Sequence, residues 1–412
     1  MMKVISIEPL TRVEGHGRVD LHVQDGRLQR VQLALLEAPR LFEGLVRNRS
    51  LQEIPALVCR ICSICSAVHR IAAATALENA LQLTIPPLAV KIRELLLLGG
   101  HIESHALHLF CLIYPDLRAA ESILTLLAQG EPSLKAGLEL KRLGNRIQEV
   151  AGGRAIHPVN IEVGGIVAAP HPPALQALLA EIEAMQGQLD GMLQPFRVGC
   201  YPPAAPVIAP RLTVAVSAQF TLQGDSLSLP DGRILPADAY PGLLKERSLP
   251  WSNAKSPSTE IFFTGALARQ EAHHKLQGRE YAPGVAGIHA NNVAQADELI
   301  WALERSRTLI LDLLAMSGAE TGSVPVPMRA GTGTAVIEAP RGILIHHYVV
   351  DDRGKIVTAD IVTPTAINQR GIEAQLLADL KDTPEADLNE SAQRIVRAFD
   401  PCISCAVHIL KV

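Results

Sequence analysis

Apolar and polar residues alternate near the start of the chain, as they do in half-buried strands. The alternation runs through residues 19–23 and again through residues 31–35, with Asp25-Gly26 between the two runs. An Asp-Gly pair in that position is typical of a tight hairpin turn. The sequence therefore predicts an N-terminal β-hairpin.

Most of the other apolar residues recur every three or four positions, which favours helices. One such run covers about residues 67–83 and ends before Pro86-Pro87. A longer run covers about residues 89–112, with Gly99-Gly100 as a candidate bend. Further helices are expected near residues 133–151, 173–195, 290–316 and 386–399.

Two later stretches have the composition of β structure. Residues 205–265 are rich in Pro, Thr, Val and Ser, and we interpret them as a β-rich insertion. Residues 335–362 contain apolar strands on either side of the turn sequence 351–354. We find neither an internal repeat nor an obvious linker. The prediction is a single domain over residues 1–412 with a helix-rich α+β fold, in which a long helix bundle carries N-terminal and peripheral β-hairpins.

Composition supports a large buried core and argues against some functions. Of the 412 residues, 48% are hydrophobic but only 3% are aromatic, so Leu, Ile, Val and Ala must supply most of the core. The formal charge of −4, without a long basic block, speaks against nucleic acid as a partner. The richest apolar stretch, residues 95–98, soon meets Gly99-Gly100, so we expect no membrane span. The N-terminus lacks the apolar segment of a secretory signal, and we expect a cytoplasmic protein.

Four of the seven cysteines form two C-x-x-C pairs, Cys62 with Cys65 and Cys402 with Cys405. In a reducing compartment such pairs indicate metal binding or redox chemistry rather than disulfides. A structural zinc site with four cysteine ligands is one reading, although structural zinc usually holds together a module with a small core. A thioredoxin-like redox pair is a weaker reading, because neither pair opens a helix after a βαβ pattern.

The residues around the two pairs favour another reading. The first pair lies in R-x-C-x-x-C-x-x-x-H and the second in D-P-C-x-x-C-x-x-H, and with these motifs the chain resembles the large subunits of nickel–iron hydrogenases. The resemblance covers residues 12 to 408. Further matching stretches are Arg12-Val13-Glu14-Gly15-His16, Arg40-Leu41-Phe42-Glu43, Ala155-Ile156-His157-Pro158 with Gly164-Gly165, Glu338-Ala339-Pro340-Arg341-Gly342, and Thr363-Pro364-Thr365 with Asn368.

The resemblance implies a nickel–iron centre that splits dihydrogen into protons and electrons. Cys62 and Cys402 would be terminal nickel ligands. Cys65 and Cys405 would bridge nickel to an iron that carries carbon monoxide and cyanide. Glu14 would accept the proton beyond the thiolates, from Cys402. Read without the resemblance, Glu14 is an ordinary surface residue or a salt-bridge partner of a neighbouring arginine.

Other residues would support this centre. Arg341 would donate to one cyanide and Thr365 to the other, while Pro340 would shape the wall beside them. His69 would donate a hydrogen bond to a cysteine sulfur. Asp400 would pair with Arg341. Glu43 and His408 would hold a separate magnesium or iron ion near the C-terminus.

Some positions carry weaker expectations. We interpret His101, His105 and His108, on one helix, as core or interface residues, and the paired histidines 273–274 and 346–347 likewise. Many related large subunits have His-Asp-His where this chain has Glu103-Ser104-His105, so the aspartate over their site is missing here. Ser63 stands where glycine is usual. Cys59, Cys111 and Cys200 are interpreted as ordinary small residues.

The resemblance also implies partners. We expect an iron–sulfur small subunit, further iron–sulfur subunits and a flavin diaphorase that links the complex to NAD(P). The residues within the motifs most resemble those of the cytoplasmic NAD(P)-linked and sulfur-reducing group. Nickel-insertion proteins and a maturation protease that cuts after His408 are expected as well. The alternatives are a dihydrogen sensor with the same site, the zinc-stapled structural subunit, and the quinone-site subunit of respiratory complex I, against which the four cysteines speak.

Overall fold

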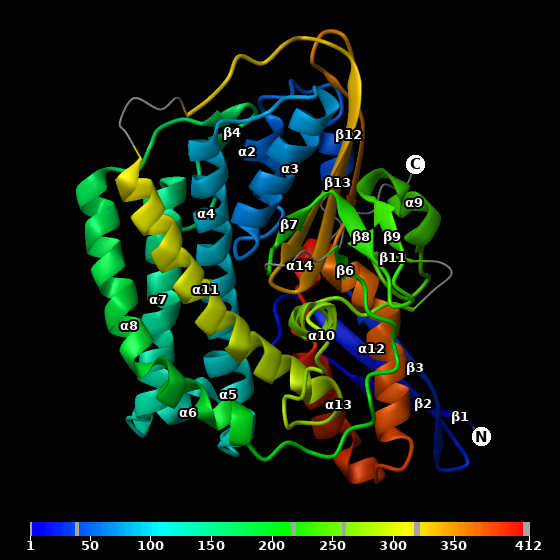
Figure 1. Cartoon of the computed structure of the whole chain (residues 1–412). Coiled ribbons are helices and arrows are strands. Elements are labelled where there is room, and N and C mark those ends of the chain that lie inside the picture. The colour runs from blue at the N-terminus through cyan, green and yellow to red at the C-terminus, as the bar shows by residue number, and fades with distance from the viewer. Residues whose placement is uncertain (1, 38–40, 216–219, 258–260, 317–321, 407–412) are drawn as a thin grey trace.

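The computed structural model describes residues 2–37, 41–215, 220–257, 261–316 and 322–406 (Figure 1). Long helices form a bundle along one side of the protein, as the sequence predicted. They are α4 (Pro87–Ala106), α7 (Pro132–Gly152), α8 (Pro172–Val198) and α11 (Ala290–Ala315), and neighbouring members pack on one another. The apolar part of their packed sides is built mostly from Leu, Ile, Val, Ala and Met, as the scarcity of aromatic residues required.

Helix α4 continues into the π-helical turn η1 (Leu107–Ile113) and the short helix α5 (Tyr114–Leu117). The 31-residue run Pro87–Leu117 is long and apolar enough to cross a membrane, which the sequence analysis did not expect. Gly99 does not interrupt it, because its missing side chain makes room for Ile147 of α7. The most apolar window of the run is 89% buried inside the protein, as in the core helix of a bundle.

The predicted N-terminal hairpin is present as β2 (Gly17–Gln24) and β3 (Arg27–Leu35), with β1 (Met2–Ile7) on its outer edge. Asp25 and Gly26 both have positive φ, 51° and 74°, as the turn of a two-residue hairpin requires. Helix α12 (Pro364–Leu380) packs on β3. The sequence analysis missed α12 because buried residues line most of its circumference and leave no simple apolar stripe.

A second sheet, of order β14-β13-β12-β7, runs through the middle of the protein. Its long hairpin joins β12 (Gly331–Ala339) to β13 (Gly342–Val350), and β14 (Ile356–Val362) follows the turn that the sequence predicted at 351–354. Helix α3 (Ser66–Ala80) lies against β12 and β13. The close approach uses Gly333, whose missing side chain leaves room for the backbone of Ala76 and Ala80.

The stretch 205–265 holds short strands, as expected, with β7 (Gln223–Gly224) on the edge of the central sheet. The others are β6 (Thr213–Val214), β8 (Ser226–Ser228), β9 (Ile234–Pro236), β10 (Glu246–Ser248) and β11 (Lys255–Pro257), with η2 (Ala237–Ala239) and α9 (Tyr240–Leu243). The remaining elements are α1 (Phe42–Leu45), α2 (Ile54–Val58), α6 (Ile123–Ala128), β4 (Ile161–Glu162), β5 (Gly165–Ile166), α10 (Ala266–Leu276), η3 (Gly287–His289), η4 (Glu385–Asp387), α13 (Leu388–Ala398) and α14 (Ile403–Ala406).

Candidate metal centre

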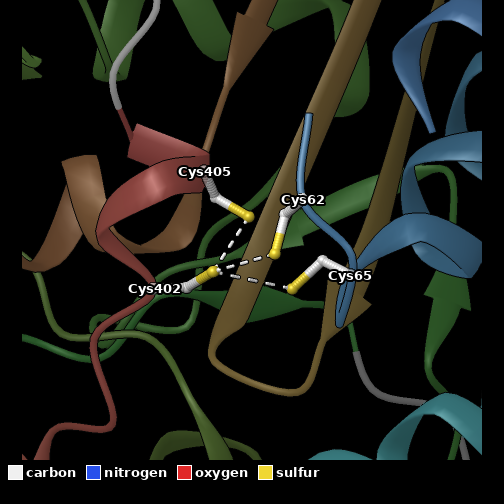
Figure 2. A group of neighbouring side chains, drawn as sticks. All are labelled: Cys62, Cys65, Cys402 and Cys405. Atoms are coloured by element: carbon white, nitrogen blue, oxygen red, sulfur yellow. Dashed lines mark hydrogen bonds between the residues drawn. The ribbon is translucent and has the colours of Figure 1, made fainter. Parts of the chain in front are cut away.

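Four cysteine sulfurs from opposite ends of the chain converge in the core (Figure 2). Cys62 lies in the turn between α2 and α3, and Cys65 is the residue from which α3 begins. Cys402 precedes α14 and Cys405 lies within it. The Sγ atom of Cys402 is 3.4 Å from that of Cys62, 4.0 Å from that of Cys65 and 3.0 Å from that of Cys405.

This arrangement fits a thiolate-bound metal centre. All four ligand atoms lie within 4.8 Å of one another, and all four side chains are buried. Four sulfurs placed tetrahedrally about 2.3 Å from one ion would be about 3.8 Å apart, close to the separations found here. Thiolates suit soft and borderline metals such as nickel, iron and zinc, so distances alone leave the metal open.

The metal-free cysteines cannot all be charged at once. Hydrogen bonds from Cys402 and Cys405 lower the pKa of Cys62 well below its ordinary value. Contacts with Cys405, Cys62 and Cys65 raise the pKa of Cys402 well above its ordinary value, and burial raises that of Cys405. A bound cation would offset the repulsion among four negative sulfurs in this buried place.

Glu14 joins the N-terminal segment to the second cysteine pair. Its backbone forms an isolated parallel bridge with Cys402 and accepts the N–H of Ile403 at 3.0 Å. Its carboxylate accepts the backbone N–H of Ser404 at 3.1 Å and the hydroxyl of Ser404. The neighbouring arginines have other partners, since Arg12 pairs with Asp116 and Arg18 with Asp20. Glu14 is therefore bound to the segment of the second cysteine pair and not to a neighbouring arginine.

Arg341 sits at the tip of the β12–β13 hairpin and reaches the cysteines. Its Nη1 lies 3.7 Å from the sulfur of Cys65, and its Nη2 donates to Asp400 at 3.1 Å, which is the expected ion pair. Burial alone would lower the pKa of Arg341, but Asp400 and the cysteine sulfurs outweigh it and raise that pKa well above its ordinary value. A permanent positive charge thus faces the quartet.

Thr365 lies at the start of α12, with its hydroxyl against the second cysteine pair. Its Oγ1 accepts the backbone N–H of Cys402 at 2.8 Å, which leaves the O–H free to donate elsewhere. Asp400, whose φ of 52° is unusual for a residue other than glycine, turns the chain into this pair. Cys402 is therefore fixed both at its own amide and by the turn before it.

Comparison with known proteins decides the family. The model of the family described as nickel-dependent hydrogenase matches residues 40–126 and 265–408, and a model described as HoxL-like matches residues 4–37. The chain belongs to the nickel-dependent hydrogenases. It is the large subunit of a nickel–iron hydrogenase, an oxidoreductase acting on dihydrogen, and its four cysteines form the nickel–iron site.

Relatives and solved structures align with this hydrogenase over nearly its whole length. The alpha subunit of sulfhydrogenase 2 from Pyrococcus furiosus is 34% identical, with 99% of this chain and 100% of the relative covered. The alpha subunit of sulfhydrogenase 1 from the same organism is 32% identical, over 99% of this chain and 98% of the relative. A crystal structure of an NAD+-reducing [NiFe]-hydrogenase has a TM-score of 0.83 at 27% identity, over 98% and 99% of the two chains. The Ni-Fe-Se hydrogenase of D. vulgaris Hildenborough shares the fold, with a TM-score of 0.81, 22% identity and 99% and 100% coverage.

His69 is buried one turn into α3 of the hydrogenase, beside the first cysteine pair. Its Nδ1 lies 3.0 Å from Nε2 of His346, whose own Nδ1 lies 2.8 Å from the hydroxyl of Tyr348. Burial lowers the pKa of His69 to about 4, so its ring is neutral. The hydrogen bond from His69 to a cysteine sulfur stays a prediction. The sequence analysis treated His346 as an ordinary residue and missed this contact, although its inward place on an alternating strand could have indicated it.

Glu43 is one of the two residues predicted to hold a second metal ion. Glu43 is buried, and its Oε1 accepts the backbone N–H of Ile361 on β14 at 3.0 Å. His408, its expected partner in holding a second ion, lies outside the described residues. The second metal site of the hydrogenase therefore stays a prediction.

The three histidines of the α4–η1 helix are core residues, as expected. His105 bonds Glu298 at 2.8 Å, and His108 bonds Gln295 and the carbonyl of Arg397. Glu103, in the segment that differs from many relatives, bonds Lys141 and Gln148 of α7. Sequence reasoning missed Ser404 and Gln295, which hold Glu14 and Asp400, because single polar residues in apolar surroundings give no pattern.

Gly15→Ala should impair catalysis more than folding. Gly15 has a φ of +87°, and a Cβ there would lie 2.7 Å from Cβ of Ile403 and 3.0 Å from the amide of Ser404. The expected result is displacement of the Glu14 segment, with about 1–3 kcal/mol lost in unfolding free energy and a larger proportional loss of hydrogen oxidation. Gly26→Ala is the control, because its φ of +74° carries the same strain with nothing within 4 Å. Equal activity in the two variants would contradict the prediction.

Proposed function

We propose that this chain carries out the reversible heterolytic cleavage of dihydrogen within a complex that passes the electrons on to NAD(P). The observation that carries the proposal is the buried quartet with a carboxylate, Glu14, hydrogen-bonded beside the second cysteine pair. Cys62 and Cys402 would hold nickel as terminal ligands, and Cys65 and Cys405 would be shared with iron. Residues 1–412 would work as one catalytic domain, with 205–265 as an insertion in it.

When bound, the nickel–iron pair supplies the Lewis acidity and the electron storage that the cleavage needs. The chain supplies the base and the path for the proton. The sulfur of Cys402 accepts the proton first, because a thiolate can be both ligand and base. Glu14 takes it next, since its backbone is paired with Cys402 and its carboxylate lies on the amide and hydroxyl of Ser404. From the partly exposed Glu14 the proton leaves toward solvent.

Arg341, Pro340 and Thr365 would surround the diatomic ligands of iron, carbon monoxide and cyanide. A buried guanidinium with Nη1 near the sulfur of Cys65 can donate to an anionic ligand there. Thr365 keeps its O–H available, because its oxygen already accepts the amide of Cys402. Pro340 closes the hairpin tip without an N–H that would need a partner. His69 would tune the cysteine sulfurs, and Glu43 with His408 would hold magnesium or iron.

The complex around this subunit is inferred from the relatives. The P. furiosus relatives are alpha subunits, which places this chain in a multisubunit hydrogenase. One structural relative is described as NAD+-reducing, and this supports electron transfer to NAD(P). We therefore propose an iron–sulfur small subunit beside the quartet, a flavin diaphorase with further iron–sulfur subunits, and a cytoplasmic location. Nickel-insertion proteins and a protease that cuts after His408 would carry out its maturation.

Infrared spectroscopy and an acceptor assay on the purified complex test the proposal. We expect carbonyl and cyanide stretching bands, and dihydrogen-dependent reduction of NAD+ or NADP+ at rates near those with an artificial viologen acceptor. If the carbonyl and cyanide bands are present but NAD(P)+ is not reduced, electron transfer to NAD(P) is refuted and the proposed cleavage site stands. If the purified protein contains zinc and its spectrum shows no carbonyl or cyanide bands, the proposed cleavage site is refuted.

A further inference from the structure

Arg341 is fixed only in part by its own contacts. One Nη lies 3.7 Å from a cysteine sulfur and the other donates to Asp400, while its Nε has no hydrogen-bond partner among the described residues. The backbone that carries it is a two-residue loop, because Ala339 of β12 pairs directly with Gly342 of β13. The direction of the guanidinium therefore depends on what holds this loop.

A second buried arginine, Arg269 of α10, holds the loop. Its Nη1 donates to the carbonyl of Ala339 at 3.0 Å and its Nη2 to the carbonyl of Pro340 at 3.1 Å. The peptide bond after Pro340 is the one that leads into Arg341. None of the five hydrogen bonds of Arg269 goes to a cysteine of the quartet, so its action on the site passes through this backbone.

The other donors of Arg269 fix the arginine in turn. Its Nε and Nη2 bind both oxygens of Glu298 at 2.7 Å, and its Nη1 binds Glu338 at 2.9 Å. The five hydrogen bonds use all five N–H donors of the guanidinium. Arg269, Glu298 and Glu338 are almost fully buried, so solvent cannot replace a lost bond.

Helix α11 links this arrangement to the partner of Arg341. Glu298 binds Arg269, and Gln295, one turn earlier on the same helix, donates to Asp400 at 3.0 Å. Asp400 is the carboxylate that pairs with Arg341. One face of α11 thus holds both the hairpin that carries Arg341 and the acid that orients it.

We infer that Arg269, held by Glu298, is a positioning residue that aims Arg341 at the metal centre. The inference rests on the proposed role of Arg341 toward the ligands of iron. Lysine at 269 keeps the charge but lacks the planar fork, and it cannot reach two carboxylates and two carbonyls together. The loop then shifts, and the contact of Arg341 with the centre shifts with it.

The test is a double-mutant cycle of Arg269→Lys and Arg341→Lys in the whole complex. In Arg269→Lys we expect unchanged nickel and iron content, cyanide bands displaced in the same direction as in Arg341→Lys, and kcat lowered by about 10–100-fold with little change in KM. The double variant should resemble Arg341→Lys alone, because both changes act through one contact. Additive effects in the cycle would overturn the inference.

Arg93→Lys is the matched control. Arg93 is equally buried, binds both oxygens of Glu78, and donates to the carbonyls of Glu162 and Gly165. Glu78 lies thirteen residues beyond Cys65 along α3, about 20 Å from the site. This variant should lose stability without moving the infrared bands.

Glu298→Gln covers the case in which Arg269→Lys fails to fold. It leaves Arg269 and both carbonyl bonds in place but weakens the anchor, so a smaller displacement of the same bands is expected. If the cyanide bands do not move in Glu298→Gln but do move in Arg341→Lys, the inference about Arg269 is overturned and the proposed role of Arg341 stands. Unmoved bands in Arg341→Lys would instead refute the proposed role of Arg341.

Discussion

Replacing Cys402 by serine is expected to abolish both metal binding and hydrogen oxidation. The sulfur of Cys402 has contacts of 3.0 to 4.0 Å with the three other sulfurs, so every metal position within the quartet uses it. A hydroxyl is a poor ligand for a borderline metal. The loss in metal affinity should exceed the roughly 10–100-fold cost of changes in the residues around metal ligands. Elemental analysis of nickel and iron in the purified protein gives the measurement.

Cys59→Ser is the matched control for this prediction. Cys59 is also buried and lies three residues before Cys62, but its sulfur contacts the carbonyl of Ala56 at 3.3 Å instead of the quartet. Burial raises the pKa of its thiol, which keeps it uncharged. The control should retain nickel, iron and activity. Retention of one nickel per chain in the Cys402 variant would place the metal elsewhere.

Replacing Glu14 by glutamine is expected to lower hydrogen oxidation and proton reduction together, by about 100- to 10,000-fold. Glutamine has the shape of glutamate and can keep the bond from the amide of Ser404, but it cannot carry a proton. The metal content should be unchanged. Conversion of para- to orthohydrogen needs only cleavage and recombination at the centre, so it should survive better than turnover. The comparison of these two rates is the measurement.

Glu8→Gln is the control for Glu14. Glu8 is a half-exposed carboxylate near the same segment, where it pairs with His16 and Arg18. Its loss should leave both rates near those of the unmodified enzyme. If Glu14→Gln oxidises dihydrogen at the normal rate, Glu14 does not lie on the proton path.

The sequence could predict those parts of the fold that have a local pattern. The N-terminal hairpin follows from alternation and an Asp-Gly turn, and the bundle helices follow from their apolar spacing, with bounds within a few residues. Helix α12 escaped because it is buried from several sides, and α10 because its polar face carries Arg269 into the core. Helix α3 is also buried on most sides and was still predicted, because most of its buried residues are apolar.

The candidate site divides in the same way. The two cysteine motifs predicted their own convergence, and the family resemblance implied the Arg341–Asp400 pair; the structure contains both. The residues that hold these groups, among them Ser404, Gln295 and Arg269, are scattered along the chain. Nothing in their local sequence distinguishes them from other polar residues, because their importance arises only when distant segments meet. The individual roles of the residues around the quartet remain predictions: Glu14, Arg341, Pro340, Thr365, His69, Glu43 and His408.

The sequence separation of 340 residues between Cys62 and Cys402 has a consequence for biosynthesis. At roughly 5–20 residues per second, the ribosome makes the later cysteine about 20–70 s after the earlier one. During that interval the nascent polypeptide has only two of the four quartet thiols, a partial chelate that zinc would readily accept. Selection of nickel and iron over zinc at the complete site can therefore take place only after both cysteine pairs have been made.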